Sequence, residues 1–178
     1  MNQTLLRILL AVAALFFTVP SVRAADAAKG FRTIGVQLYL PNEAMQERVP
    51  DVSDLANFIK AIQKVCTDHY AATDTAEALA IVAAIKPNNK TRFWFVSSRN
   101  TPDKDFNALR DKLAKIPAPK VVSGPVAFAI QSSIAGGAPD KPSQQPPIPK
   151  EWQTAADATK SKEPLLVPDG FLKLVWPD

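Results

Sequence analysis

ALAIVAAIKPNNKTRFWFV, residues 78–96, is the stretch that decides the fold. Residues 78–85 alternate larger and smaller apolar side chains, and residues 91–96 are aromatic and β-branched, which is typical of a strand. Between them, residues 87–90 form a cluster with turn chemistry. The alanines of residues 78–85 also favour helix, but the turn and the strand that follow indicate a β-hairpin.

Toward the C-terminus, the pattern predicts a helix and then another strand. Thr101 is expected to cap the helix, Pro102 to take its first position and Asp103 to favour the positive end of its dipole. Apolar residues follow at spacings of three and four, namely Phe106, Leu109, Leu113 and Ile116. Two prolines end this helix, and the alternation over residues 126–131 predicts a strand that ends before Gly136.

Toward the N-terminus, residues 33–40 alternate in the same way and predict a strand that ends at Pro41. After a polar connection, Ser53 is the expected N-cap of a helix. Its apolar face consists of Leu55, Phe58, Ile59, Ile62, Val65 and Cys66. The chain is thus expected to be an α+β domain of order βαββαβ, a small β-sheet with two helices packed on one face.

The first 24 residues are typical of a secretory signal peptide. Arg7 precedes an apolar run over residues 8–19, and Pro20 breaks that run. Because the small Ala24 suits signal peptidase, cleavage is expected between Ala24 and Ala25. An uncleaved anchor is the alternative, but about 12 apolar residues are fewer than the ~20 that a spanning helix needs. The mature protein is expected in the periplasm or outside the cell, without stable membrane insertion.

Composition narrows the class of protein further. The chain has 21 Lys and Arg against 17 Asp and Glu. Loss of residues 1–24 removes two arginines, which leaves 19 against 17, a net charge of +2. Basic residues such as Lys60 and Lys64 alternate with acidic ones, so nucleic-acid binding is not expected. A single cysteine excludes an internal disulfide and favours a bacterial periplasmic protein.

The C-terminal part has two further segments. Five prolines between residues 138 and 150 predict an extended course, either a tether laid across the surface or a projecting ligand segment. Trp152 opens a short Ala-rich helical pattern, and residues 165–176 are apolar enough that we expect them to pack back on the domain, as short strands around residues 168–170. The predicted organisation is a signal peptide at 1–24, an α+β domain at 25–137, a Pro-rich linker at 138–150 and a tail at 151–178.

Residues 78–137 resemble the C-terminal domain of the TonB and TolA energy-transducing proteins in their hairpin, proline-led helix and final strand. The turn at residues 86–90 lies where that family has its hairpin turn, and the helix from Leu55 to Cys66 matches the family's preceding helix. The resemblance implies a periplasmic module that binds a protein partner by strand addition at a sheet edge. It does not extend to energy transduction, because the family domain ends its chain and follows an uncleaved anchor.

The sequence holds no catalytic signature, and we expect no catalytic residue, cofactor or metal site. Cys66 and His69 are three apart on a helix and could form a thiolate–imidazole pair, but Cys66 lies on the apolar face. A single histidine, with Asp68 and Asp74 nearby, matches no metal-ligand spacing. Converging carboxylates for hydrolysis remain open, with Glu43, Glu47 and Asp51 as candidates.

Two functions follow from these patterns. The first is a non-enzymatic, exported protein-binding or assembly module. The second is a small secreted enzyme or ligand-binding protein of ferredoxin-like α+β fold, with a pocket between sheet and tail. A bare apolar sheet edge favours the first, and polar groups with perturbed pKa values in a concave site favour the second. Trp94 between Phe93 and Phe95 is expected in the core rather than on an exposed aromatic platform.

Overall fold

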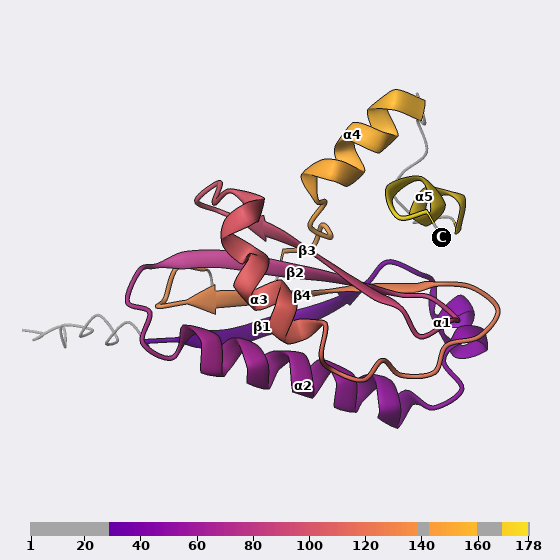
Figure 1. Cartoon of the computed structure of the whole chain (residues 1–178), viewed down its shortest axis with the longest axis horizontal. Coiled ribbons are helices and arrows are strands. Elements are labelled where there is room, and N and C mark those ends of the chain that lie inside the picture. Colours follow the sequence, from indigo (N-terminus) through magenta and orange to yellow (C-terminus); the bar gives the residue numbers. More distant parts are fainter. Residues whose placement is uncertain (1–28, 139–142, 160–168, 178) are drawn as a thin grey trace, which may run out of the picture.

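The computed structural model describes residues 29–138, 143–159 and 169–177 (Figure 1). The predicted signal peptide lies outside these residues and stays a prediction. The elements are β1 (Phe31–Leu38), α1 (Asn42–Arg48), α2 (Val52–Tyr70), β2 (Glu77–Ile85), β3 (Thr91–Ser97), the 3-10 helix η1 (Asp103–Phe106), α3 (Asn107–Leu113), β4 (Val126–Ile134), α4 (Lys150–Thr159) and α5 (Asp169–Val175). In the part described, no helix has both the length and the apolar character needed to cross a membrane.

Four antiparallel strands form one sheet in the order β1-β4-β2-β3. The predicted hairpin is confirmed: β2 pairs with β3 from Leu79 opposite Ser97 to Ile85 opposite Thr91. Asn89 in its turn has a φ of 59°, a left-handed conformation that asparagine tolerates better than most residues. The α+β class is confirmed as well, and the last strand, β4, is inserted between β1 and β2.

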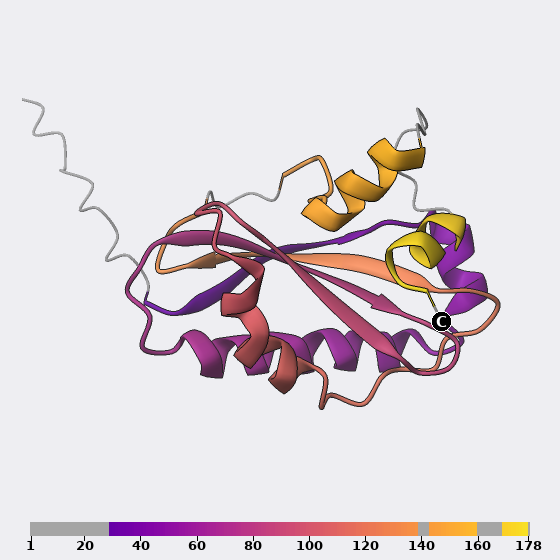
Figure 2. The same cartoon turned by 45° about the horizontal axis from the view of Figure 1, so that its top comes forward.

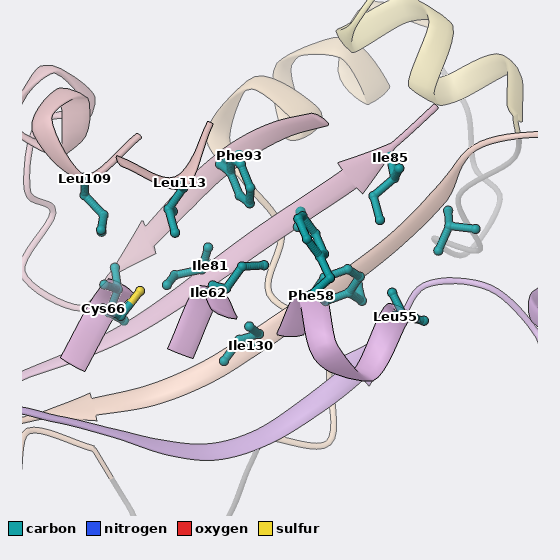
Figure 3. Packing of buried hydrophobic residues seen from close by; sticks show 14 of the residues in the cluster. Leu55, Phe58, Ile62, Cys66, Ile81, Ile85, Phe93, Leu109, Leu113 and Ile130 are labelled. Carbon is teal, nitrogen blue, oxygen red and sulfur yellow. The ribbon is translucent and has the colours of Figure 1, made fainter. Parts of the chain in front are cut away.

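Helices α2 and α3 cover one face of the sheet. The buried positions of α2 are Leu55, Phe58, Ile62 and Cys66, at spacings of three and four. Figure 3 shows these side chains directed toward the sheet, where they meet residues such as Ile81 and Ile130. Leu109 and Leu113 of α3 are fully buried in the same cluster. The helix predicted from residue 101 is real but begins as η1, and Ile116 lies beyond its end.

Helices α4 and α5 lie on the opposite face (Figures 1 and 2). Trp152 of α4 is fully buried there and contacts Trp94, Tyr39 and Phe171. The prediction that the tail packs back on the domain is therefore confirmed, as is the core position of Trp94. The strand expected after residues 168–170 was wrong, because Asp169–Val175 is helical and its buried residues are Phe171 and Leu172. Residues 165–168 of the expected strands lie outside the described residues.

Several predicted boundaries and caps were also wrong. The side chain of Asp51, not Ser53, caps α2 by accepting a hydrogen bond from the Ser53 N–H at 2.7 Å. Thr101 caps no helix, since its hydroxyl meets Ser97 and Glu77. The connection before α2 contains the helix α1, which polar residues concealed. By contrast, β4 ends at Ile134, before Gly136 as predicted.

Candidate functional site

The sheet has two outer strands, β1 and β3, and each has one side without a strand neighbour. Such an edge presents backbone N–H and C=O groups that another strand can pair with. The two edges differ in how much of this backbone other elements cover. That difference decides where a partner could add a strand.

In the second half of β1, the backbone groups of two residues point away from β4. The Tyr39 N–H donates to the Ala127 carbonyl at 3.1 Å, which fixes the residues that bond to β4. Since alternate residues of an antiparallel strand bond to the same neighbour, Val36 and Leu38 direct their N–H and C=O groups to the open side. In the described parts of the chain no strand pairs with that side.

The side chains at this edge are apolar and half-exposed. Val36 and Leu38 are each 41 % exposed, and the register places them on the α2 side, beside Ile130 and Phe128. Helix α2 runs antiparallel to β1 (Figure 1), and Tyr70 near its end stacks on Phe31 at 6.2 Å.

The first turn of α2 consequently lies toward the other end of β1. Val52 in that turn is 69 % exposed. We call Val36 and Leu38 the edge strip. It forms an apolar margin beside the outward-facing backbone of β1.

Natural edges usually carry features that discourage pairing, such as a charge, a proline or a bulge. In β1 these features are confined to its first half, where Arg32 is exposed and a bulge interrupts the register between Thr33 and Gly35. Residues 36–38 contain neither a charge nor a proline, and the register is regular there. The second half of β1 therefore has none of the features that discourage pairing with another strand.

The edge at β3 is less accessible. The Ser98 N–H donates to the Ala78 carbonyl, so Phe93 and Phe95 direct their backbone groups outward. Phe93 is only 3 % exposed. Phe95 stacks on Phe106 of η1 with ring centroids 4.6 Å apart. Little of this edge is open to an added strand.

The two residues considered for nucleophilic chemistry, Cys66 and His69, lie in different surroundings on α2. Cys66 is fully buried in the α2 core, and desolvation raises the pKa of its thiol to about 12, so it stays protonated. The His69 ring nitrogen Nδ1 lies 3.2 Å from the Lys112 Nζ. Desolvation, and then the charge of Lys112, lower the pKa of His69. Cys66 is thus a packed core residue with a protonated thiol, and His69 lies beside Lys112.

The acidic candidates do not converge. Glu43 and Glu47 are exposed on α1, and Asp51 is engaged as the cap of α2. Asp68 pairs with Lys64 at 2.9 Å on the surface of α2. In the residues that the structure describes, no group of three or more His, Cys, Asp or Glu side chains could hold a metal ion.

One buried acid was not singled out in the sequence. Glu77 is 9 % exposed and accepts hydrogen bonds from the hydroxyls of Ser97 and Thr101. It joins the start of β2 to the end of β3 and to the turn before η1. In the sequence, Glu77 stands out only as a glutamate directly before an apolar strand, and this does not predict that it is buried.

Sequence reasoning predicted strand addition at a sheet edge without identifying the edge. The apolar alternation of residues 33–40 predicted the strand β1. The same alternation occurs in strands whose apolar side chains are covered, so it did not show that Val36 and Leu38 are half-exposed. Only the strand order shows that β1 is an outer strand. Comparisons of the chain with protein-family models, with curated proteins and with solved structures find no match.

Proposed function

We propose that this chain is a non-enzymatic protein-binding module that accepts an extended segment of a partner protein as a fifth strand beside β1. The observation that carries the proposal is the outward backbone of Val36 and Leu38 next to their own half-exposed side chains. Main-chain hydrogen bonds then supply affinity, and pockets for alternate side chains supply specificity. The resemblance to the TonB and TolA domains supports the same class of function.

The edge strip defines the kind of segment that would bind. Alternate side chains of an added strand point to opposite faces of the sheet. Those on the α2 side meet the edge strip and should be apolar. Those on the other side lie near Gln37, whose amide is hydrogen bonded to the Ser143 carbonyl, and should be polar. An alternating segment of about five residues meets both requirements.

The location of this binding activity is part of the proposal. The predicted leader at residues 1–24 supports export, and the single cysteine supports a bacterial periplasm. A partner would therefore be a periplasmic protein or the periplasmic segment of a membrane protein.

The test is to select displayed ten-residue peptides on the full chain and to measure how edge variants change the Kd of the selected peptide. Val36→Pro removes an outward N–H without removing a bond to β4, as edge strands tolerate. Loss of one hydrogen bond worth about 1 kcal/mol weakens binding roughly five-fold. Leu38→Lys places a charge on the edge strip, and we expect a loss of about ten-fold.

A matched control is Leu174→Lys on α5, because Leu174 is 56 % exposed and lies on the opposite face. This variant should bind the peptide as the parent does. Protection of the Val36 and Leu38 amides from hydrogen exchange would place the peptide on β1. Three outcomes contradict the proposal: no selected peptide binds, both edge variants keep the parental Kd, or the protection lies elsewhere.

A further inference from the structure

The sheet face under α4 and α5 has two halves that are filled differently. Over one half, Trp152 and Phe171 pack on a floor of small residues. This floor consists of the alanines at 84, 127 and 129, all of them fully buried. The face is thus built to hold a flat aromatic ring against the strand backbones.

The other half of the same face is hollow. Ala80 pairs with Val96, and this pair follows Val82 and Trp94 along the two strands on the same side of the sheet. Ala80 and Val96, together with Ala78 and Ile34, line a cavity of about 520 Å³. Ligand cavities commonly occupy roughly 300–1,000 Å³. Small side chains create this space, as the alanines do beneath Trp152.

Hydrogen bonds hold one wall of the cavity in place. The Ser143 N–H donates to the Gln131 amide oxygen at 2.7 Å, and the Gln37 amide donates to the Ser143 carbonyl at 2.7 Å. Gln131 is only 9 % exposed and also donates to Gln37. Further along the segment, the Tyr39 hydroxyl donates to the Pro147 carbonyl. These bonds join the segment 143–147 to β1 and β4 on this side of the cavity.

The lining determines what the cavity could hold. None of the described residues around it is charged. The polar groups of Gln131 and Ser132 already bond within the protein, Ser132 to the Leu79 carbonyl at 2.6 Å. Among the described lining residues, a charged ligand would find no charged partner in return for its lost hydration, which is costly. An apolar ligand would gain by leaving water.

We infer that this cavity binds a small, uncharged, flat aromatic molecule of two or three rings. The neighbouring half of the face shows the mode of contact, an indole lying on alanines with aromatic neighbours. The cavity is on the opposite face of the sheet from the edge strip, so this inference does not rest on strand addition at β1.

The experiment uses N-phenyl-1-naphthylamine, an uncharged fluorescent probe, titrated into the full chain. We expect a saturable fluorescence increase. Ala80→Phe fills the cavity from β2 and should weaken probe binding by ten-fold or more. Ala72→Phe is the matched control, since Ala72 is exposed in the turn after α2 and should leave binding unchanged.

Circular dichroism shows whether Ala80→Phe folds, and a second variant is used if it does not. Val96→Trp fills the same space from a half-exposed strand position and should weaken binding to a similar extent. Leu38→Lys should leave probe binding unchanged. Failure of the cavity inference can therefore be distinguished from failure of the proposed strand addition at β1. Absence of saturable binding, or equal affinity in the cavity variants and in Ala72→Phe, would overturn the inference.

Discussion

Replacement of Trp152 by alanine tests whether α4 and α5 are held on the sheet by one aromatic anchor. The indole is fully buried, and its ring centroid lies 5.3 Å from Tyr39, 5.2 Å from Trp94 and 5.5 Å from Phe171. A buried area of about 200 Å² at about 25 cal/mol per Å² corresponds to about 5 kcal/mol. Residual burial in the unfolded chain lowers this to about 4 kcal/mol.

A second contribution acts in the opposite direction. The Trp152 Nε1 is buried and has no hydrogen-bond partner in the described parts of the chain. A buried donor without a partner costs about 1–3 kcal/mol. The expected net loss on Trp152→Ala is therefore about 1–3 kcal/mol. Trp152→Phe, which keeps a ring and removes the unpartnered N–H, should lose less than about 1 kcal/mol.

Native-state hydrogen exchange measures this loss where it occurs. The amides of α4 should lose protection by roughly 5- to 150-fold in Trp152→Ala, while the amides of β2 and β4 change much less, because the α2 core is untouched. Trp176→Ala is the control, since Trp176 is only partly buried and contacts Trp94 at 6.4 Å. A change in α4 protection below about three-fold would refute the reasoning.

Two further predictions concern the α2 helix. Asp51→Ala should lower the free energy of unfolding by about 1 kcal/mol, measured by urea denaturation, because the cap of α2 is lost, whereas Ser53→Ala should change it by less than half as much. The raised pKa of Cys66 means that the unfolded chain releases the thiol proton first as pH rises, so stability should fall between about pH 9 and about 12. Cys66→Ala should show a smaller fall than the parent over this range, and identical pH profiles would contradict the assignment.

Local patterns predicted the elements better than their arrangement. The hairpin was predictable because residues 87–90 favour a turn and the aromatic residues after them favour a strand. Helix α2 was predictable because its apolar residues repeat at helical spacing. The insertion of β4 between β1 and β2 depends on contacts between residues about a hundred positions apart, which no local window contains. The segment of α5 was wrongly predicted as a strand, because over only seven residues its apolar side chains fit both the strand period of two and the helix period of 3.6.

The candidate sites were predictable in kind but not in place. The alternation of β1 shows which side chains share a face, and it cannot show whether a neighbour covers them. The cavity beside Ala80 depends on the position of the segment around Ser143, which is set by hydrogen bonds to Gln131 and Gln37. Neither glutamine is distinguished in the sequence from an exposed polar residue.

The pairing of β1 with β4 has a consequence for how the chain assembles. Phe31 lies opposite Ile134 and Leu38 opposite Phe128, so the first strand to be synthesised has only the last strand as its neighbour. A ribosome must finish β4 before β1 has anywhere to dock, and such distant contacts form slowly. Once β4 is in place beside β2, its free side is the edge that β1 pairs with, and in the completed sheet the outer position has passed from β4 to β1.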